Sequence, residues 1–378
     1  MPRTIGVIGG GQLAAMLTTE ATAGGVDVIA LDPTPRCPAA VAGARQIVSS
    51  VFDETALRTL VQSVDITTVE LENVHLDLLH QLELEGHTIV PAPAVIAVIA
   101  DKLAQKEVFA KQGIATAAFS PMPTPAASEV RAFGFPCVQK AARGGYDGRG
   151  VTVMRDETEL VNLLPVPGFL EAFVPNATEL GVMVARSRCG EEAVYPVTEM
   201  VFNGAGNMLD YLLAPARIPG AVERAAKDLA LQAVRAVNGT GIFGVEMFLT
   251  HTGQLLVNEM APRTHNCGHF TIDACATSQF AQQLRLLTGT PLGSPSQHRA
   301  AAMINLLGAA GYAGAARIYG VDKARTAGPV NIYLYGKHEC RPLRKMGHLT
   351  ALGATVDEAL ADARKASQAI IIRGEQVC

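Results

Sequence analysis

One segment constrains this chain most: an apolar run that ends in an amide and an acid and is followed closely by two bases. Leu255-Leu256-Val257 leads into Asn258-Glu259, and Arg263 and His265 come soon after. A strand would carry the amide and the acid to its end, and the loop beyond it would bring the bases alongside. We interpret the segment as a site for Mg²⁺ together with an anion. A polar loop after a buried strand is the alternative.

A second apolar run supplies a partner for that strand. Residues 241–248 are rich in apolar side chains and carry one acid, Glu246, and a Thr-Gly turn at 252–253 separates the two runs. The pattern predicts a β-hairpin in which Glu246 and Glu259 lie side by side. Two carboxylates in a dry strand pair repel each other unless a cation lies between them. We therefore expect Mg²⁺ there, bridging phosphate oxygens.

The composition is that of an ordinary globular protein. The chain has 378 residues, of which 49% are apolar and 17% charged, so two or three domains and a large core are expected. A net charge of −4, the absence of tryptophan and an aromatic content of 5% argue against a nucleic-acid partner. The seven cysteines show no CxxC spacing, which indicates reduced thiols in a cytoplasmic protein.

The apolar stretches do not indicate a membrane protein. Residues 4–8 enter a strand at once, so we expect no signal peptide. The longest apolar stretch, 90–100, contains two prolines and is too short to span a bilayer. The expected partners are therefore small molecules, with neither nucleic acid nor membrane.

A glycine run near the start of the chain predicts a nucleotide-type fold. Residues 5–8 form a short strand pattern, Gly9-Gly10-Gly11-Gln12-Leu13 follows, and a helical pattern comes next. Consecutive glycines before a helix let backbone N–H groups converge on an anion. The run also fits the dinucleotide fingerprint, with Asp32 as the ribose acid. An NAD-dependent oxidoreductase therefore stays open as an alternative, although a lone glycine fingerprint is a weak signal.

Two more strand patterns continue the α/β series. They cover residues 47–50 and 65–70, and the second runs on into Glu70-Leu71-Glu72-Asn73. Because side chains alternate along a strand, Glu70 and Glu72 would share one face. A solvated strand end is the equally simple alternative.

The middle of the chain carries a glycine-rich hairpin. We expect a helix over residues 95–113 that carries Lys102, and then a proline-rich linker at 120–125. A strand at 135–140 ends in Lys140, and a loop from Arg143 to Gly150 leads into a strand at 151–154. This is neither a Walker loop nor a Rossmann turn. We interpret it as a lid over a triphosphate, since closure would keep water from a reactive phosphate, and a plain mobile hairpin is the alternative.

The next strand pattern, residues 168–174, contains Glu171 and is followed by Glu179. Its carboxylate and backbone groups could hold adenine and ribose. Two later apolar helical patterns, 225–237 and 278–287, are expected to be core faces or subunit contacts.

In this order, these residues resemble the ATP-grasp ligases. Within that superfamily the chain looks like the 5-(carboxyamino)imidazole ribonucleotide synthetases of purine biosynthesis. The motifs that carry the resemblance are Gly9-Gly10-Gly11-Gln12-Leu13, Glu70-Leu71-Glu72-Asn73-Val74, Arg143-Gly144-Gly145-Tyr146-Asp147-Gly148-Arg149-Gly150, Asn258-Glu259-Met260-Ala261-Pro262-Arg263-Thr264-His265-Asn266-Cys267-Gly268-His269 and Arg344-Lys345-Met346-Gly347-His348. The Tyr-Asp loop and the late Arg-Lys-Met-Gly-His are far more specific than any single glycine run.

The resemblance implies an α/β chain with the ATP-grasp fold. It implies a Rossmann-like parallel-sheet domain over 1–99, a small lid domain over 100–183, and a C-terminal α+β domain over 184–378. The implied reaction joins bicarbonate to the amine of aminoimidazole ribonucleotide through carboxyphosphate, with ATP as energy source and Mg²⁺ as cofactor. A homodimer is also expected.

The resemblance also assigns residues to roles. Metal ligation falls to Glu246 and Glu259, and catalytic roles to Arg263, His265, Tyr146, Asp147 and Arg149. ATP contacts fall to Lys102, Lys140, Gly145, Tyr146, Asp147, Gly148, Arg149, Gly150, Val151, Glu171, Ala172, Phe173, Val174, Glu179, Asn258 and Glu259. Ribonucleotide contacts fall to Gly11, Gln12, Leu13, Glu72, Asn73, Asp147, Arg344 and Lys345.

The chain departs from the family pattern in three places. Ala14-Ala15 stand where Gly-Arg is usual, so no arginine contact carries over to that helix. Phe202 stands where a histidine is expected near the nucleotide, and Cys267 replaces the usual serine, a thiol being a weaker hydrogen-bond donor. None of these departures touches the expected metal pair.

Two histidines and several rival functions remain open. His269 is either a catalytic imidazole or a residue that orients the loop, and His348 is either a phosphate ligand or a packed turn residue. The rival enzymes are a formate-dependent glycinamide ribonucleotide transformylase and a biotin carboxylase, both ATP-grasp enzymes. A nucleotide-binding protein without catalysis is the further alternative.

Overall fold

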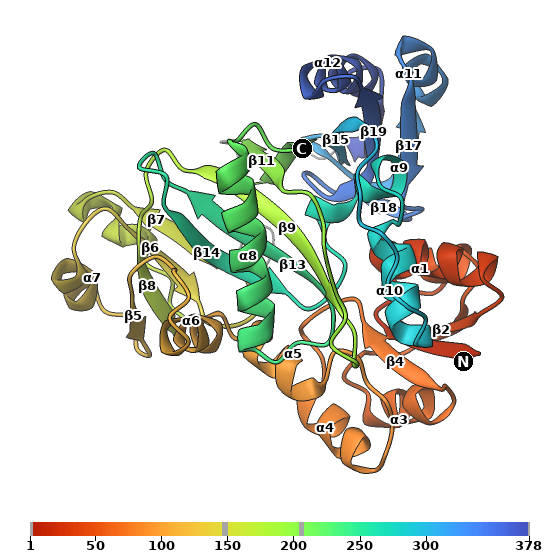
Figure 1. Ribbon diagram of the computed structural model, residues 1–378, viewed down its shortest axis with the longest axis horizontal. Coiled ribbons are helices and arrows are strands. Elements are labelled where there is room, and N and C mark those ends of the chain that lie inside the picture. The colour runs from red at the N-terminus through yellow and green to blue at the C-terminus, as the bar shows by residue number, and fades with distance from the viewer. Residues whose placement is uncertain (1–2, 146–149, 204–207, 377–378) are drawn as a thin grey trace.

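The computed structural model describes residues 3–145, 150–203 and 208–376. The described residues form four sheets: a parallel N-terminal sheet, a small antiparallel sheet, a large central sheet and a three-stranded sheet near the C-terminus (Figure 1). The N-terminal domain and a small olive-coloured sheet lie on opposite flanks of a large central sheet, and the last third of the chain extends one end of that large sheet. None of the helices in these described ranges is long and apolar enough to cross a membrane.

The N-terminal domain is the predicted parallel α/β unit. Its sheet has the order β3-β2-β1-β4, and every pairing in it is parallel. The strands are β1 (Thr4–Ile8), β2 (Asp27–Leu31), β3 (Arg45–Ile47) and β4 (Ile66–Val69), and the helices are α1 (Gln12–Ala23), α2 (Pro38–Val41), α3 (Glu54–Gln62) and α4 (Leu76–Leu84). Both faces of the sheet bury apolar side chains, as a parallel sheet requires. The strand predicted at 47–50 lies earlier, because residues 48–50 have already left the sheet.

The helix predicted over residues 95–113 is two helices. α5 (Pro93–Ala100) and α6 (Lys102–Lys111) are separated by Asp101, whose carboxylate accepts hydrogen bonds from the backbone N–H groups of Leu103 and Ala104. An aspartate in extended conformation at this position is an N-cap. The helical periodicity hid the break because buried positions recur at helical spacing on both sides of Asp101.

The lid is an antiparallel sheet of order β5-β8-β6-β7. Its strands are β5 (Phe119–Met122), β8 (Gly168–Ala172), β6 (Cys137–Ala141) and β7 (Val151–Met154), with helix α7 (Ala127–Phe133) and the 3₁₀ helix η1 (Glu157–Asn162). The predicted β6–β7 hairpin is confirmed. The prediction of a linker at 120–125 is wrong for residues 120–122, where β5 pairs with β8, and Pro121 is tolerated because β5 is an edge strand. Residues 123–125 do connect β5 to α7.

The large sheet has the order β14-β13-β9-β11-β12-β15-β19-β17, with β10 paired to β9. Its first part contains β9 (Thr178–Arg186), β10 (Glu192–Val194), β11 (Thr198–Asn203), β12 (Met208–Ala214), β13 (Gly241–Leu249) and β14 (Leu255–Ala261). Alternation along β9 explains its two covers: Val182 and Val184 pack in the cluster with helix α8 (Gly220–Ala236), whereas Met183 and Ala185 face the opposite side. Helix α10 (Gln279–Thr288) contacts β9 and β13 and also α1 of the N-terminal domain.

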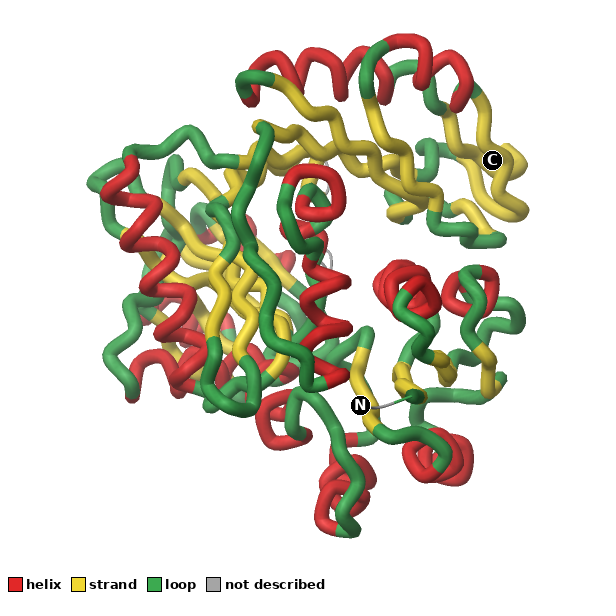
Figure 2. The backbone as a smooth tube through the Cα atoms, turned by 45° about the vertical axis from the view of Figure 1, so that its right-hand side comes forward, coloured by secondary structure: helices red, strands yellow, loops and turns green. Residues whose placement is uncertain are grey.

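The last third of the chain adds its strands to the same sheet. These are β15 (Ala300–Leu307), β19 (Lys345–Gly353) and β17 (Val330–Leu334), covered by α11 (Val321–Ala327) and α12 (Val356–Ser367) (Figure 2). A small sheet of β18 (Glu339–Cys340), β16 (Tyr312–Tyr319) and β20 (Ile371–Gln376) lies beside them. The 3₁₀ helix η2 (Asn266–Gly268) and helix α9 (Thr271–Ala274) lie between β14 and α10.

Candidate active site

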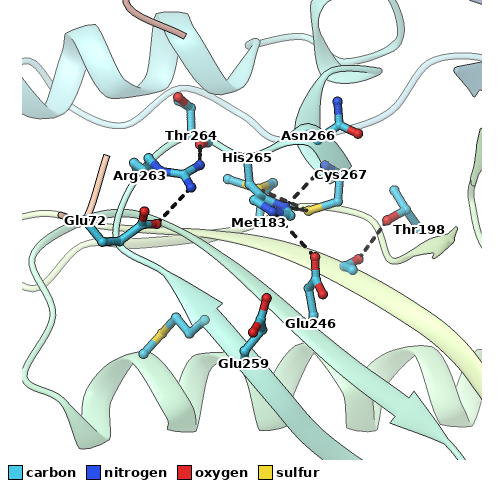
Figure 3. Close-up of polar contacts among 12 residues, drawn as sticks. Glu72, Met183, Thr198, Glu246, Glu259, Arg263, Thr264, His265, Asn266 and Cys267 are labelled. Atoms are coloured by element: carbon cyan, nitrogen blue, oxygen red, sulfur yellow. Dashed lines mark hydrogen bonds and ion pairs between the residues drawn. The ribbon is translucent and has the colours of Figure 1, made fainter. Parts of the chain in front are cut away.

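The predicted acid pair lies on the β13–β14 hairpin. Glu246 and Glu259 are Cα partners in the antiparallel register, and a register shift follows immediately after Glu246. Figure 3 shows both carboxylates on one side of the strands, below His265. The hairpin that the sequence predicts is therefore confirmed, and it brings the two acids together.

The two acids influence each other's protonation. Burial raises the pKa of Glu246, and the charges of Glu259 and Glu179 raise it further. Burial also acts to raise the pKa of Glu259, but Lys102 and Lys140 outweigh it and hold the value low. The two pKa values are thus displaced in opposite directions, as expected for two acids that share a site.

These residues fit a Mg²⁺ ion that also needs phosphate ligands. Among the described residues, no three His, Cys, Asp or Glu side chains converge as a complete metal cage. Mg²⁺ is bound in proteins by one or two carboxylates together with substrate phosphates and water. Glu246 and Glu259, with the amide of Asn258 beside them on β14, match that requirement.

Lysines from two different elements reach the acid pair. Lys102, the first residue of α6, forms an ion pair with Glu259. Lys140 on β6 places its Nζ 2.7 Å from Oδ1 of Asn258 and 2.6 Å from Oε2 of Glu171. The lid sheet and the large sheet are thus linked through Lys140.

A third lysine, Lys106, was missed from the sequence. It is 2% exposed, forms an ion pair with Glu171, and has its Nζ 3.3 Å from the carbonyl oxygen of Val257. Burial lowers its pKa to about 8. Its position four residues after Lys102 places both on one helix face, and this spacing was the available signal.

The loop after β14 supplies the predicted cations. Arg263 donates from Nη2 to Oε1 of Glu72 at 2.9 Å, and Nε2 of His265 lies 3.5 Å from Oε1 of Glu246 (Figure 3). His265 can lie across β13 because residue 244 is glycine: an added Cβ there would be 2.5 Å from Cβ of His265. His265 therefore reaches the acid pair, whereas Arg263, two residues earlier in the loop, pairs with Glu72 of the N-terminal domain.

The prediction that Glu70 and Glu72 share a strand face is wrong. β4 ends at Val69, and the two acids turn to different partners. Glu72 pairs with Arg263. Glu70 accepts hydrogen bonds from the backbone N–H groups of Gly11 and Leu13.

The backbone N–H groups of the glycine run are therefore already bonded to acidic side chains of the chain itself. Glu70 occupies the N–H groups at the start of α1, and Oδ2 of Asp32 accepts from the N–H of Gly10 at 2.9 Å. In a dinucleotide-binding fold these groups serve the pyrophosphate and the ribose. Their use within the chain argues against the NAD-dependent oxidoreductase.

Both open histidines are buried and neutral. Nδ1 of His269 lies 2.8 Å from the amide nitrogen of Gln279, which can only donate, and burial lowers the pKa of His269 well below its usual value. Burial lowers the pKa of His348 to about 3, and its Nδ1 lies 2.9 Å from the hydroxyl of Tyr335. The two rings pack against each other with centroids 4.7 Å apart. These surroundings favour an orienting role for His269 and a packing role for His348.

The lid loop lies partly outside the described residues. Tyr146, Asp147, Gly148 and Arg149 belong to that part, so their predicted roles have no structural account. Before them, Arg143 pairs with Asp101 at 2.9 Å. After them, the Gly150 carbonyl accepts from the N–H of Ala141, and Val151 begins β7. Gly144 and Gly150 both have positive φ, which the tight turns at each end of the loop require; Gly145 lies between them.

The remaining predicted nucleotide residues lie along β8 and β9. Glu171 is in β8, Ala172 ends it, and Phe173 and Val174 follow in the connection to β9, which carries Glu179. Burial raises the pKa of Glu179 to about 7, with Glu259 adding to the effect and Lys140 opposing it. Glu179 is therefore in electrostatic reach of the metal pair.

The residues predicted to bind the ribonucleotide come from two domains. Gln12 begins α1, and Asn73 lies between β4 and α4. Lys345 begins β19 and is near enough to lower the pKa of Glu246. Arg344 donates from Nη1 to the carbonyl of Glu339 at 2.7 Å.

Two of the three departures from the family pattern, Phe202 and Cys267, have different surroundings. Phe202 on β11 packs against an apolar cluster. Cys267 is fully buried with its Sγ 3.2 Å from Nδ1 of His265. Burial raises the pKa of this thiol well above its usual value, so Cys267 contacts the site as a protonated thiol.

Comparisons with known families cover almost the whole chain. Residues 2–100 match the ribonucleotide synthetase preATP-grasp domain, residues 107–280 match the ATP-grasp domain, and residues 301–362 match the phosphoribosylaminoimidazole carboxylase C-terminal domain. The three matches correspond in turn to the N-terminal domain, to the lid sheet together with the β13–β14 hairpin, and to the C-terminal strands.

Individual relatives agree with these matches. The N5-carboxyaminoimidazole ribonucleotide synthase of Synechococcus elongatus is 40% identical over 353 residues, which cover 92% of this chain and 88% of the relative. That of Bacillus subtilis is 35% identical, with 94% and 92% covered.

Solved structures have the same fold. The N5-carboxyaminoimidazole ribonucleotide synthetase of Thermotoga maritima superposes with a TM-score of 0.91 at 43% identity, covering 99% of this chain and 100% of that one. The Aspergillus clavatus enzyme in complex with ADP and 5-aminoimidazole ribonucleotide gives 0.88 at 30% identity, with 97% and 98% covered. The chain belongs to the N5-carboxyaminoimidazole ribonucleotide synthase family of ATP-grasp ligases.

Proposed function

We propose that this chain carboxylates the amine of 5-aminoimidazole ribonucleotide with bicarbonate and ATP, giving N5-carboxyaminoimidazole ribonucleotide, ADP and phosphate in purine biosynthesis. The observation that carries the proposal is the acid pair Glu246–Glu259, which Lys102, Lys140 and His265 reach from three different segments, with Arg263 in the adjoining loop paired to Glu72. The family of the chain supplies the substrates.

In the first step, a bicarbonate oxygen bonds to the γ-phosphorus of ATP while the bond to ADP breaks, which forms carboxyphosphate. Phosphoryl transfer depends on positioning and charge neutralisation. Lys102 and Lys140 would lie along the phosphates. Glu246 and Glu259 would hold Mg²⁺, which neutralises phosphate charge when bound. Glu259 would then exchange its ion pair with Lys102 for the metal.

In the second step, the substrate amine attacks the carboxyl carbon, the carbon–oxygen bond to phosphate breaks, and the nitrogen loses a proton. Arg263 suits the planar carboxylate because its guanidinium donates two parallel hydrogen bonds. We assign Tyr146, Asp147 and Arg149 to closure of the lid. Carboxyphosphate is short-lived in water, so the lid has to exclude water while the intermediate exists.

The ribonucleotide would lie between the N-terminal domain and β19. Glu70 already takes the N–H groups of Gly11 and Leu13, so the glycine run is a poor site for the 5′-phosphate. We therefore assign the phosphate to Arg344 and Lys345. Gly11, Gln12, Leu13, Glu72 and Asn73 would line the adjoining wall.

Acceptor dependence tests the proposal. Phosphate release is measured with Mg²⁺, ATP and bicarbonate, and then with aminoimidazole ribonucleotide, glycinamide ribonucleotide (also with formate) or biotin added separately. We expect strong stimulation by aminoimidazole ribonucleotide alone. Stimulation by another acceptor would transfer the chain to that ATP-grasp activity, and ATP binding without phosphate release would indicate a binding protein.

The proposal includes a cytoplasmic homodimer and domain limits near residues 99 and 183. β9 runs from Thr178 to Arg186, so the second limit falls within a strand of the large sheet. Light scattering on the purified chain would show twice the chain mass of 39.7 kDa if the dimer exists.

A further inference from the structure

Among the described residues, four buried glutamines make the same pair of hydrogen bonds, which we call a backbone clamp. Each side-chain amide accepts from the backbone N–H of one distant residue and donates to the C=O of that same residue. The pairs are Gln105 with Met260, Gln139 with Leu164, Gln279 with His265 and Gln282 with Gly293. All four glutamines are at most 2% exposed.

An amide suits this role because it presents one acceptor and two donors in a plane. It pairs with a residue much as a neighbouring strand would, and it satisfies two buried backbone groups at once. Leaving such groups unpaired is costly. Each clamp therefore fixes the backbone of one chosen residue.

Two of the four clamps hold opposite ends of the segment that bears the site. Gln105 on α6 holds Met260, the residue after Glu259, with bonds of 2.9 and 3.2 Å. Gln279 at the start of α10 holds His265 with two bonds of 2.9 Å. Arg263 lies between the two clamped residues. The other two clamps hold Leu164 after η1 and Gly293 after α10.

Gln279 is itself anchored on two sides. Its backbone N–H donates to Oγ1 of Thr271 at 2.8 Å. Its neighbour Ser278 donates from Oγ to Glu20 of α1 at 3.0 Å. The amide nitrogen also lies 2.8 Å from Nδ1 of His269. The packing is tight enough that a Cβ at Gly268 would lie 2.5 Å from Oε1 of Gln279.

We infer that Gln105 and Gln279 are positioning residues for the reaction, because they fix the backbone on either side of Arg263 and so set where Glu259 and His265 point. The inference rests on the proposed function for its kinetic consequence only. The geometric consequence, a displaced His265, follows from the clamp itself. Small displacements of catalytic groups reduce turnover strongly.

Gln282 provides a matched control for Gln279. Both are in α10 and fully buried, and both make the same two bonds to one backbone residue, at 2.8 and 3.0 Å for Gln282. Methionine has a similar length and no amide. Gln279→Met and Gln282→Met therefore remove the same two backbone bonds from the same helix. The first also removes the contact with Nδ1 of His269 and is the one that touches the site.

The test measures melting temperature, steady-state kinetics and the NMR signals of the His265 imidazole, assigned with a His265→Gln variant. We expect similar falls in melting temperature for the two methionine variants. Gln279→Met should lower kcat at least tenfold with KM for ATP changed less than threefold, and should shift the His265 signals. Gln282→Met should leave kcat and the His265 signals unchanged. Gln105→Met should also lower kcat.

A second variant covers the case in which Gln279→Met does not fold. Gln279→Asn keeps the amide donors and acceptor but is one methylene shorter, so it can satisfy His265 only in part, and we expect a smaller fall in kcat and a smaller shift of the His265 signals. Equal kinetics and unshifted His265 signals in the Gln279 and Gln282 variants would overturn the inference. Shifted signals in a protein without acceptor-dependent turnover would uphold the inference and remove the proposed function.

Discussion

Glu171 and Glu246 are both acids on strands of the candidate site, yet their surroundings are opposite. Glu171 is 2% exposed and has a lysine on each oxygen, Lys106 on one and Lys140 on the other. Burial acts to raise its pKa, but the two lysines outweigh burial and lower it. Glu246 faces Glu259, and its pKa is raised.

The difference separates an acid that maintains the fold from one that awaits a ligand. Glu171 forms a network with cations of the chain, so its charge is already compensated. Nε2 of His265 lies 3.5 Å from Glu246, and the charges of Lys102 and Lys345 act to lower its pKa, but burial and the acid across the strand pair outweigh them. A buried acid that the chain leaves poorly compensated is a candidate for an added cation.

Replacing the compensated acid should have the largest effect on stability. Glu171→Gln leaves Lys106 and Lys140 buried without their anion, and we expect a loss of about 3–5 kcal/mol in the free energy of unfolding. Urea denaturation measures it. The control is Glu157→Gln, which breaks the exposed pair with Arg131 and should cost less than about 1 kcal/mol. Similar losses in both would refute the distinction.

Replacing an acid of the metal pair should affect turnover instead. Glu259→Gln keeps the volume, removes the charge and should lower kcat about a hundredfold or more, with an unchanged circular dichroism spectrum. Glu223→Gln, which breaks a half-buried ion pair with Lys227 on α8, serves as control. Unchanged turnover in Glu259→Gln would remove the acid pair from the site.

A smaller effect is expected at Lys345, the residue assigned to the 5′-phosphate. Lys345→Ala should raise KM for the ribonucleotide about tenfold, as for loss of one charge-assisted hydrogen bond, and leave KM for ATP within about twofold. Steady-state kinetics with each substrate varied gives both values, and Lys365→Ala on α12 is the control. An effect on ATP alone would place Lys345 at the nucleotide.

The smallest expected effect is a pH dependence of opposite sign for the two acids. The pKa of Glu246 is raised, so the unfolded chain releases that proton first, and stability falls as pH rises above about 5. The gain in unfolding free energy from Glu246→Gln, measured without Mg²⁺, should therefore grow from pH 5 to neutrality.

For Glu171 the sign is reversed. Its pKa is lowered, so its contribution is present above the unfolded value and is lost as pH falls through the folded value. The loss from Glu171→Gln should therefore shrink in acid. Parallel pH profiles for the two variants would contradict the comparison.

Much of the site was predictable because its residues are close in sequence. The hairpin that joins Glu246 to Glu259 follows from alternation and a short turn, and the Arg263 and His265 loop follows directly. The parallel N-terminal sheet follows from its strand and helix periods. In each case local physics and the final fold agree.

The missed features depend on partners that are distant in sequence. Glu70 is 59 residues from Gly11 and accepts a hydrogen bond from its N–H. No local pattern indicates that an acid will bind the N–H groups of the glycine run. Lys106 becomes part of the site only when β14 and β8 pack against α6. The break at Asp101 was visible as an N-cap signal, but a continuous helical period concealed it.

The unbroken ladder of the large sheet limits how this enzyme can be dissected. β12 pairs with β15 from Tyr211 to Ala214, so hydrogen bonds run straight across the gap between the matched ATP-grasp and C-terminal segments. Truncation near residue 290 would remove β15 and leave the backbone N–H and C=O groups of β12 unpaired at a sheet edge, where strands of other chains can pair with them. We therefore expect that the segment matched to the ATP-grasp domain, residues 107–280, will not fold properly when it is expressed alone or fused to another protein.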